Sequence, residues 1–375
     1  MTATTMSATR VHVREAVHDD DAALRAIAAS CPMEGDITLR ITRDPGFFQL
    51  NQLEGSQWRL GVAEVDGHVV GCVMAAERSA YLYGVERRTL YAGDLKVHPT
   101  MRGTGVADAL SKWVARELFD MGGANAPILL TILGGNSAME RRTSGRGGMP
   151  NFARFATIRA FSIPLLFPRA FRERALRVST ATARDIEEMV ELWRRVAPTR
   201  QLAPVLVAET FERWIANAPG LDISSYRVAR DASGRIVGFM AWWDQVTFKQ
   251  SRVLRYSPRL RVARALLNGA AAVTRGTPLP EAGELLRYCT AFNICVPADS
   301  TEVLRALVRS SYAELRDARY AFATVGLDVR DPLCAALSEL FAQPTDVNAF
   351  ICSPSGDYSG PSLADRPLHD EIALV

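Results

Sequence analysis

The stretch from residue 89 to residue 119 constrains the fold of this chain more than any other part of the sequence. Residues 89–99 alternate between apolar and polar side chains, which predicts a β-strand. A turn that contains two glycines follows at 100–107. The next segment, 108–119, has apolar residues at helical spacing, namely Ala109, Leu110, Trp113, Val114 and Leu118. The stretch therefore predicts a strand, a tight loop and a helix in immediate succession.

The glycines of this loop predict an anion site. Gly103 and Gly105 allow successive backbone N–H groups to point into one concavity, at the positive end of the following helix dipole. Phosphate and pyrophosphate bind at such places. The spacing is not that of a GxxxxGK[ST] loop, because no lysine follows the second glycine, and the third glycine of GxGxxG is missing. The loop must therefore be judged by another pattern.

That pattern is Arg-x-x-Gly-x-Ala, formed by Arg102, Gly105 and Ala107 directly after a strand that ends in Val97-His98-Pro99. It resembles the acyl-CoA-binding motif [Q/R]-x-x-G-x-[G/A] of the GNAT N-acyltransferase superfamily. An ordinary strand-to-helix turn is the alternative. The resemblance implies a mixed β-sheet flanked by helices, and acetyl-CoA or another acyl-CoA as co-substrate.

The resemblance also implies which residues hold the coenzyme. The main chain of Leu95 and Val97 would pair with the pantetheine arm, and the loop would hold the pyrophosphate, mostly through backbone N–H groups. The loop residues concerned are Arg102, Gly103, Thr104, Gly105, Val106 and Ala107.

Two residues are candidates for a catalytic role. Asp94 resembles the acidic residue that many family members place just before the pantetheine segment as a base, and a structural hydrogen bond is the alternative. Asn136 begins the family's Asn-x-x-Ala-x-x-x-Tyr pattern, but here Met139 stands at the alanine position and Thr143 at the tyrosine position. The general acid that would protonate the leaving thiolate is therefore unassigned.

Length and composition limit the class of protein. A chain of 375 residues suggests two domains, and 48% hydrophobic with 23% charged residues is typical of a soluble globular protein. The net charge of +3 is too small to indicate nucleic acid. Six cysteines without paired spacing predict reduced thiols and no metal site. No secretory signal or membrane-spanning run is evident, so we expect a cytoplasmic protein.

The order of predicted elements divides the chain into two similar domains and two tails. Residues 11–170 follow the GNAT order and form the predicted acyl-CoA-binding catalytic domain. Residues 171–354 repeat much of that order, but Pro297–Ser300 replaces the glycine loop and brings an acidic residue. We therefore expect an α/β fold (an α+β mixed sheet) of two tandem GNAT-like domains, the second degenerate. Residues 1–10 and 355–375 are expected to be tails, the first disordered and the second partly so.

Two further segments concern the surroundings of the site. By resemblance to the family, 31–52 forms a second helix and part of the acceptor wall. Residues 246–286 interrupt the repeat and interleave arginines with aliphatic residues, which predicts an amphipathic helix. It would pack on its own domain or on a second subunit. An anionic acceptor, a membrane surface and a partner protein are the alternatives.

The sequence thus predicts an acyl-CoA-dependent N-acyltransferase that transfers acetyl from acetyl-CoA to a primary amine by direct attack. The acceptor is a small-molecule or protein amine, and a homodimer is one possible state. Neither nucleic acid nor a membrane is expected as a partner. The rival hypotheses are a non-catalytic acyl-CoA-binding or scaffold protein and a long-chain N-acyltransferase that acts near a membrane.

Overall fold

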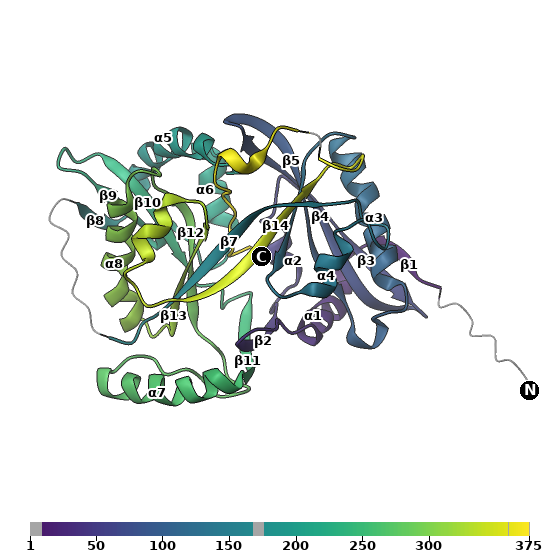
Figure 1. The fold of residues 1–375 in the computed structure, drawn as a ribbon, viewed down its shortest axis with the longest axis horizontal. Coiled ribbons are helices and arrows are strands. Elements are labelled where there is room, and N and C mark those ends of the chain that lie inside the picture. The colour runs from purple at the N-terminus through teal and green to yellow at the C-terminus, as the bar shows by residue number, and fades with distance from the viewer. Residues whose placement is uncertain (1–9, 168–175, 359, 375) are drawn as a thin grey trace, which may run out of the picture.

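The computed structural model describes residues 10–167, 176–358 and 360–374. The predicted tail at 1–10, except Arg10, and the predicted domain boundary between 170 and 171 lie outside these ranges. Figure 1 shows strands that run through the whole molecule, with helices packed against them on both sides. The fold class predicted from the sequence is therefore confirmed.

The first half of the chain contains the predicted strand, loop and helix. Its main elements are β1 His12–Glu15, α1 Asp21–Ser30, β2 Ile37–Thr42, α2 Phe48–Asn51, β3 Gln57–Val65, β4 His68–Leu82, β5 Val85–Val97, α3 Val106–Gly122, β6 Ile128–Leu133, α4 Ser137–Arg142 and β7 Ala153–Pro164. The helix expected within 31–52 is reduced to the single turn of α2. The β-branched residues of 37–42 form a strand instead, because such side chains favour the extended backbone.

The second half repeats this pattern with one addition. Its main elements are β8 Arg177–Thr180, α5 Ile186–Val196, α6 Ala208–Asn217, β9 Tyr226–Arg230, β10 Ile236–Trp243, β11 Gln250–Tyr256, α7 Pro258–Thr274, β12 Tyr288–Cys295, α8 Thr301–Asp317, β13 Phe322–Asp328 and β14 Gln343–Cys352. The predicted insertion holds α7, as expected, but its first part is the strand β11, which pairs with β2 of the first half.

One sheet of twelve strands joins the two halves, in the order β1-β3-β4-β5-β6-β14-β7-β13-β12-β10-β9-β8. The halves therefore run inward from opposite edges in matching order, β1-β3-β4-β5-β6 against β8-β9-β10-β12-β13. The neighbours β5 and β6 are parallel, and so are β12 and β13, whereas the other pairs of this sheet are antiparallel. This correspondence supports the internal repeat seen in the sequence.

The last strand of each half is exchanged with the other half. β7 pairs with β13, β14 pairs with β6, and β7 and β14 pair with each other at the centre of the molecule (Figure 1). The sequence predicted β7 but not β14, whose first residues, Gln343–Asp346, are polar and include a proline. Only the second part of β14 is buried. Because of this exchange, β6 and β7 of the first half each pair with a strand of the second half.

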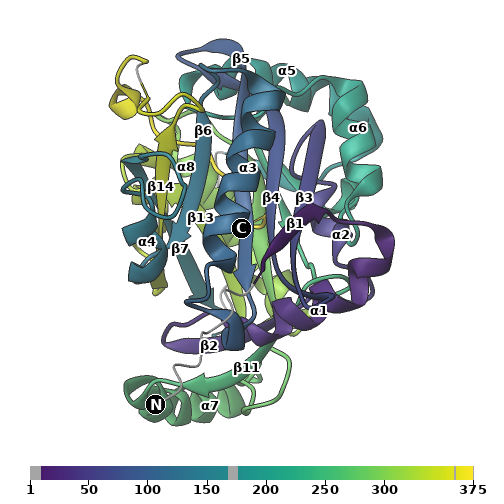
Figure 2. The same ribbon diagram turned by 90° about the vertical axis from the view of Figure 1, so that its right-hand side faces the viewer.

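Helices cover both faces of the first half's strands. Leu110, Trp113 and Leu118 of α3 pack on one face, with Leu90 and Ala92 of β5. Figure 2 shows α3 lying across β4, β5 and β6. Leu24 and Ala28 of α1 pack on the opposite face, together with Tyr91. Successive β5 residues thus point to opposite faces, as the strand's period of two requires.

The C-terminal stretch, predicted to be a partly disordered tail, packs between the halves where it is described. Leu363, Leu368 and Ala373 are buried. Gln201 exchanges backbone hydrogen bonds with this stretch, because its N–H donates to Pro367 and its carbonyl accepts from His369. Apolar residues at wide spacing anchor the segment, whose regular structure among the described residues is the short 3-10 helix Leu363–Asp365.

From the composition and the sequence we expected no membrane-spanning run and reduced cysteines. None of the described helices combines the length and hydropathy needed to cross a bilayer. The six cysteines are free.

The strand exchange predicts that the first half does not fold alone. A fragment of residues 10–167 lacks β14, so β6 and β7 lose the strand that joins them. We expect no cooperative thermal transition for this fragment by circular dichroism. Appending residues 340–358 through a glycine–serine linker should restore one. A cooperative transition in the bare fragment would show that the exchange does not matter for stability.

Candidate functional site

The candidate site begins where two parallel strands separate. β5 and β6 are paired only from Leu90–Ile128 to Ala92–Leu130. Beyond this point β5 contains a bulge, because its register with β4 shifts between Cys72 and Met74. Asp94 lies in this bulge with a φ of 54°, in the left-handed region that non-glycine residues seldom adopt. The bulge turns residues 93–97 away from β6, so the two strands separate beyond Ala92, and we call this separation of the two backbones the crevice.

The glycine loop lies at the end of the same strand. Gly103 and Gly105 have φ angles of 82° and 90°, which L-residues adopt only with strain. A Cβ added to either glycine would meet no atom within 4 Å, so the space beside the loop is open. In the part of the chain that the structure describes, the N–H groups of Gly103, Gly105, Val106 and Ala107 have no acceptor. Four free donors thus gather where the 17-residue α3 begins.

This loop has the properties of a phosphate site. Unpaired amides at a helix N-terminus, together with the helix dipole, stabilise a bound anion. The side chain of Arg102 is exposed, with Nη2 at 3.9 Å from Cys31 Sγ. Thr104 Oγ1 donates to the carbonyl of Met101 at 2.7 Å, so its hydroxyl stabilises the turn. The backbone N–H groups and the Arg102 side chain are therefore the groups that remain to make the predicted pyrophosphate contacts.

Leu95 and Val97 lie on the strand segment beyond the bulge. Both pack partly buried against the α3 side of the sheet. The carbonyl of Val97 accepts a weak bond from Cys31 Sγ at 3.4 Å. The structure thus brings the predicted pantetheine strand and the predicted pyrophosphate loop into one continuous path.

Asp94 is held by three side chains. Arg43 donates two hydrogen bonds to its carboxylate, each of 2.7 Å, Asn51 donates a third of 3.0 Å, and Lys96 forms a further ion pair. Burial by itself raises the pKa of Asp94, but the charges of Arg43 and Lys96 outweigh it and hold the pKa well below its usual range. A carboxylate of such low basicity, with both oxygens bonded, is a poor proton acceptor. The geometry supports the structural alternative for Asp94 over the role of base.

Asn136 also has a structural role. Its Oδ1 accepts the N–H of Met139 at 3.2 Å and caps the N-terminus of α4. Thr143, at the position where the family's tyrosine is expected, is buried and donates its hydroxyl to the carbonyl of Glu140 at 2.7 Å. Neither side chain is free to act as a general acid.

A buried acidic cluster near the crevice was not predicted. It comprises Glu54, Arg78, Tyr91 and Asp370. Glu54 and Asp370 both pair with Arg78, whose guanidinium lies 3.9 Å from the centre of the Tyr91 ring. Tyr91 Oη lies 3.3 Å from Thr131 Oγ1, on the first β6 residue after the pairing with β5 ends. The cluster therefore lies on the α1 face beside the opening of the crevice.

Glu54 is the member of this cluster best suited to proton transfer. It is 4% exposed, and burial, partly offset by Arg78, raises its pKa to about 7. Asp370 Oδ2 is buried and has no hydrogen-bond partner among the described residues. No local motif could have revealed this arrangement, because Glu54 lies in a short loop and Asp370 comes from the other end of the chain.

The second half contains the same separation of two parallel strands. β12 and β13 are paired from Tyr288–Phe322 to Thr290–Thr324, and Asn293, with a φ of 48°, lies in a bulge that matches the one at Asp94.

Here the C-terminal stretch fills the space. The N–H of Asn293 donates to Glu371 at 3.1 Å, and Ile372 would lie 2.8 Å from a Cβ placed on Gly326. The loop before α8, Pro297–Ser300, has no glycine. The second half therefore keeps the strand separation and the bulge of the first half, but not its glycine loop.

The buried ion pair of Asp94 makes a prediction about stability. Asp94→Asn leaves Arg43 and Lys96 without a compensating charge, so we expect the free energy of unfolding to fall by about 3–5 kcal/mol. Because the pKa of Asp94 is lowered in the folded protein, its contribution is complete at neutral pH and is lost as the pH falls below about 4.

The matched control is Asp346→Asn. Asp346 also pairs with an arginine, Arg159, at 2.8 Å, but both side chains are more than one third exposed. This change should cost less than about 1 kcal/mol. Urea unfolding of both variants at pH 7 measures the difference, and equal losses would contradict the structural role of Asp94.

The family model described as Acetyltransferase (GNAT) family matches residues 23–141. The comparison with curated proteins gave no match. Several solved structures are similar over most of this chain. One is the Saccharomyces cerevisiae N-myristoyltransferase with bound myristoyl-CoA, with a TM-score of 0.61 and 14% identity, covering 91% of this chain and 82% of that chain.

Two others differ in how much of their own length is matched. A GCN5-related N-acetyltransferase from Sphaerobacter thermophilus has a TM-score of 0.56 and 14% identity, covering 96% of this chain and 97% of that chain. A GCN5-related glucosamine N-acetyltransferase region of a fungal multi-domain β-N-acetylglucosaminidase has a TM-score of 0.61 and 13% identity. This match covers 92% of this chain and 38% of that chain. The chain therefore contains a GNAT acetyltransferase domain, matched at residues 23–141, and over most of its length it has the same fold as these solved structures.

Proposed function

We propose that this protein is an acyl-CoA-dependent N-acyltransferase with one coenzyme site per chain. The observation that carries the proposal is the separation of β5 from β6 beyond Ala92, together with four unpaired amides of the described residues at the start of α3. At the corresponding separation in the second half, residues of the same chain occupy the space. The matched family and the acyltransferases of similar fold support this assignment.

In this proposal the strand segment 93–97 pairs with the pantetheine arm, and the amides of 103–107 hold the pyrophosphate. The thioester then lies in the crevice, close to the bulge. A rigid strand and a helix N-terminus supply most of the binding, so the reacting carbonyl is held in place without large movements. Backbone N–H groups of the bulge would stabilise the negative charge that develops on the carbonyl oxygen.

Glu54 is the proposed base in place of Asp94. An amine acceptor that enters on the α1 face meets Glu54 beside Tyr91, and its ammonium group gives up one proton to the Glu54 carboxylate. The amine lone pair then attacks the thioester carbon to give a tetrahedral intermediate. The C–S bond breaks, and the second proton of the attacking nitrogen passes to the departing sulfur, so that a neutral amide and the coenzyme A thiol are released. A pKa of about 7 allows Glu54 to accept and release this proton near neutral pH.

Acetyl-CoA is the proposed donor, because acetyl transfer is the commonest activity that the family resemblance implies. A longer acyl group is the alternative, since one structure of similar fold is a myristoyltransferase with bound myristoyl-CoA. A second candidate function is acyl-CoA binding without transfer. It is favoured by the loss of the family's tyrosine at Thr143, whose hydroxyl is already bonded.

The first prediction concerns the loop. Gly105→Asp places a carboxylate in the open space that the pyrophosphate would fill, so we expect coenzyme A affinity to fall at least about 100-fold by repulsion and exclusion. Isothermal titration with coenzyme A and acetyl-CoA measures the affinity and should give one site per wild-type chain.

Gly67→Asp is the matched control, because Gly67 also has a positive φ, 78°, and open space around it. Both variants carry the backbone strain of a side chain at positive φ, about 1–2 kcal/mol, but only the loop variant should lose binding. Retained affinity in Gly105→Asp would overturn the loop assignment, and two sites per wild-type chain would overturn the closed state of the second crevice.

The second prediction concerns Glu54. The rate of acyl transfer should rise with pH through about 7 as Glu54 loses its proton. In Glu54→Gln we expect the turnover number to fall about 100-fold or more and this pH dependence to disappear, whereas coenzyme affinity changes little.

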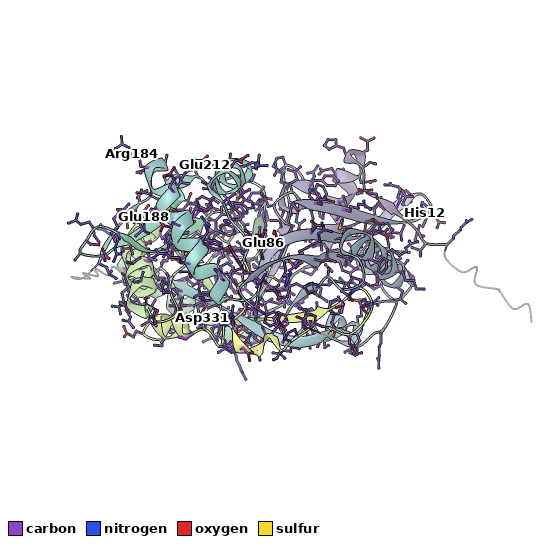
Figure 3. The ribbon with its side chains drawn as sticks, turned by 90° about the horizontal axis from the view of Figure 1, so that it is seen from above. His12, Glu86, Arg184, Glu188, Glu212 and Asp331 are labelled. Carbon is purple, nitrogen blue, oxygen red and sulfur yellow. The ribbon has the colours of Figure 1, made fainter. Side chains whose placement is uncertain are left out.

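Glu86→Gln serves as the control, because Glu86 is an exposed glutamate at the start of β5 (Figure 3). Steady-state rates between pH 5.5 and 9 with a panel of primary amines supply the measurement. A pH profile in Glu54→Gln that matches the wild type would exclude Glu54 as the base.

A further inference from the structure

The inserted segment forms an appendage at one end of the molecule. We define the α7 appendage as residues 250–287, which contain β11 and α7 and pair with β2 of the first half. Figures 1 and 2, which are turned by 90° from each other, both show α7 at the lower end of the molecule. α7 therefore lies at the periphery of the described residues.

One side of α7 attaches it to the protein. Ala271 is buried, and Leu260 and Leu267 pack on a small core that includes Leu39, Val253 and Tyr256. Arg264 lies against the Tyr256 ring, at 5.4 Å from its centre, and pairs with Glu281 at 3.6 Å. This side of the helix is thus occupied by contacts within the appendage.

The opposite side of α7 is an exposed apolar stripe. Val262, Leu266 and Val273 are 69%, 74% and 86% exposed, and with Phe341 they are the most exposed large hydrophobic side chains of the described residues. Each residue turns an α-helix by about 100°, so these three share one side, roughly opposite Leu260 and Leu267. Gly269 lies between them with open space around it. An apolar stripe that faces directly away from its own core indicates a docking surface.

The charged residues of the appendage are mostly positive. The appendage contains seven arginines and two glutamates, whereas the whole chain has a net charge of only +3. α7 itself contains no acidic residue. Arg259 and Arg261 flank the stripe on its two sides, are exposed, and have no ion-pair partner among the described residues. On the adjoining ribbon, Arg252 lies directly opposite Arg40, which places two like charges side by side.

We propose that α7 docks on the surface of an anionic phospholipid membrane. The apolar stripe enters the boundary between head groups and acyl chains, and the arginines on either side pair with lipid phosphates. A second copy of this chain fits less well, because two α7 helices packed stripe to stripe would bring arginines together with no acidic residue on either helix. From the sequence we expected no membrane partner, and a membrane surface was only one alternative for residues 246–286. The exposed stripe, which only the structure shows, is the reason for the change.

This inference rests on the α7 appendage alone and does not depend on the proposed acyltransferase activity. It is tested with the full-length protein by flotation with vesicles of phosphatidylcholine, with and without about 30 mol% phosphatidylglycerol. We expect binding only to the anionic vesicles, with a partition coefficient that falls at least about fivefold when sodium chloride is raised from about 0.1 to about 0.5 M.

Two variants test the two parts of the surface. Leu266→Asp removes apolar contact and should lower the partition coefficient about tenfold or more. Arg259→Glu with Arg261→Glu should lower it by a similar factor and reduce its dependence on salt. Val85→Asp, at another exposed apolar position, and Arg184→Glu, on the opposite side of the molecule beside α5 (Figure 3), are the controls and should bind as the wild type does.

Light scattering of the wild type and Leu266→Asp separates lipid docking from self-association. A monomer that floats with anionic vesicles through these residues supports the proposal. Absence of flotation, equal loss in the control variants, or a dimer that Leu266→Asp dissociates would each overturn it.

Discussion

The bidentate ion pair between Asp94 and Arg43 is the interaction on which the candidate site depends. Asp94 occupies a left-handed backbone conformation in the bulge of β5, a strain of about 1–3 kcal/mol that must be offset by other contacts. Arg43, Asn51 and Lys96 supply those contacts from three directions. Without the bulge, β5 would continue alongside β6 and the crevice would close. The carboxylate that resembled a catalytic base thus builds the site by fixing its geometry.

The comparison of the two halves shows which features belong to the fold and which to the chemistry. Both halves keep the parallel strand pair and the bulge, at Asp94 and at Asn293. The glycine loop follows the bulged strand in the first half, whereas Pro297–Ser300 stands at this place in the second half. In the second half the C-terminal stretch bonds to Asn293, and the same stretch brings Asp370 to Arg78 and Glu54 in the first half. One segment therefore closes the unused crevice and completes the acidic cluster beside the open one.

Local patterns in the sequence predicted the local structure well. The alternation of 89–97, the glycines of the loop and the helical spacing after 108 depend on neighbouring residues, and β5, the loop and α3 follow them closely. The contacts of Asp94 could not be predicted, because Arg43 and Asn51 precede it by more than forty residues and no motif joins them. The same holds for Glu54 and Asp370, from opposite ends of the chain. β14 was missed because its polar first part gains its stability from β6 and β7, not from its own pattern.

The central claim is that coenzyme binds in the first crevice and not in the second. Hydrogen–deuterium exchange of the full-length protein, with and without saturating coenzyme A, tests it most directly. We expect slower exchange of the backbone amides in peptides that cover residues 93–107, with no change in peptides that cover 293–301. Protection at 293–301, or none at 93–107, would contradict it.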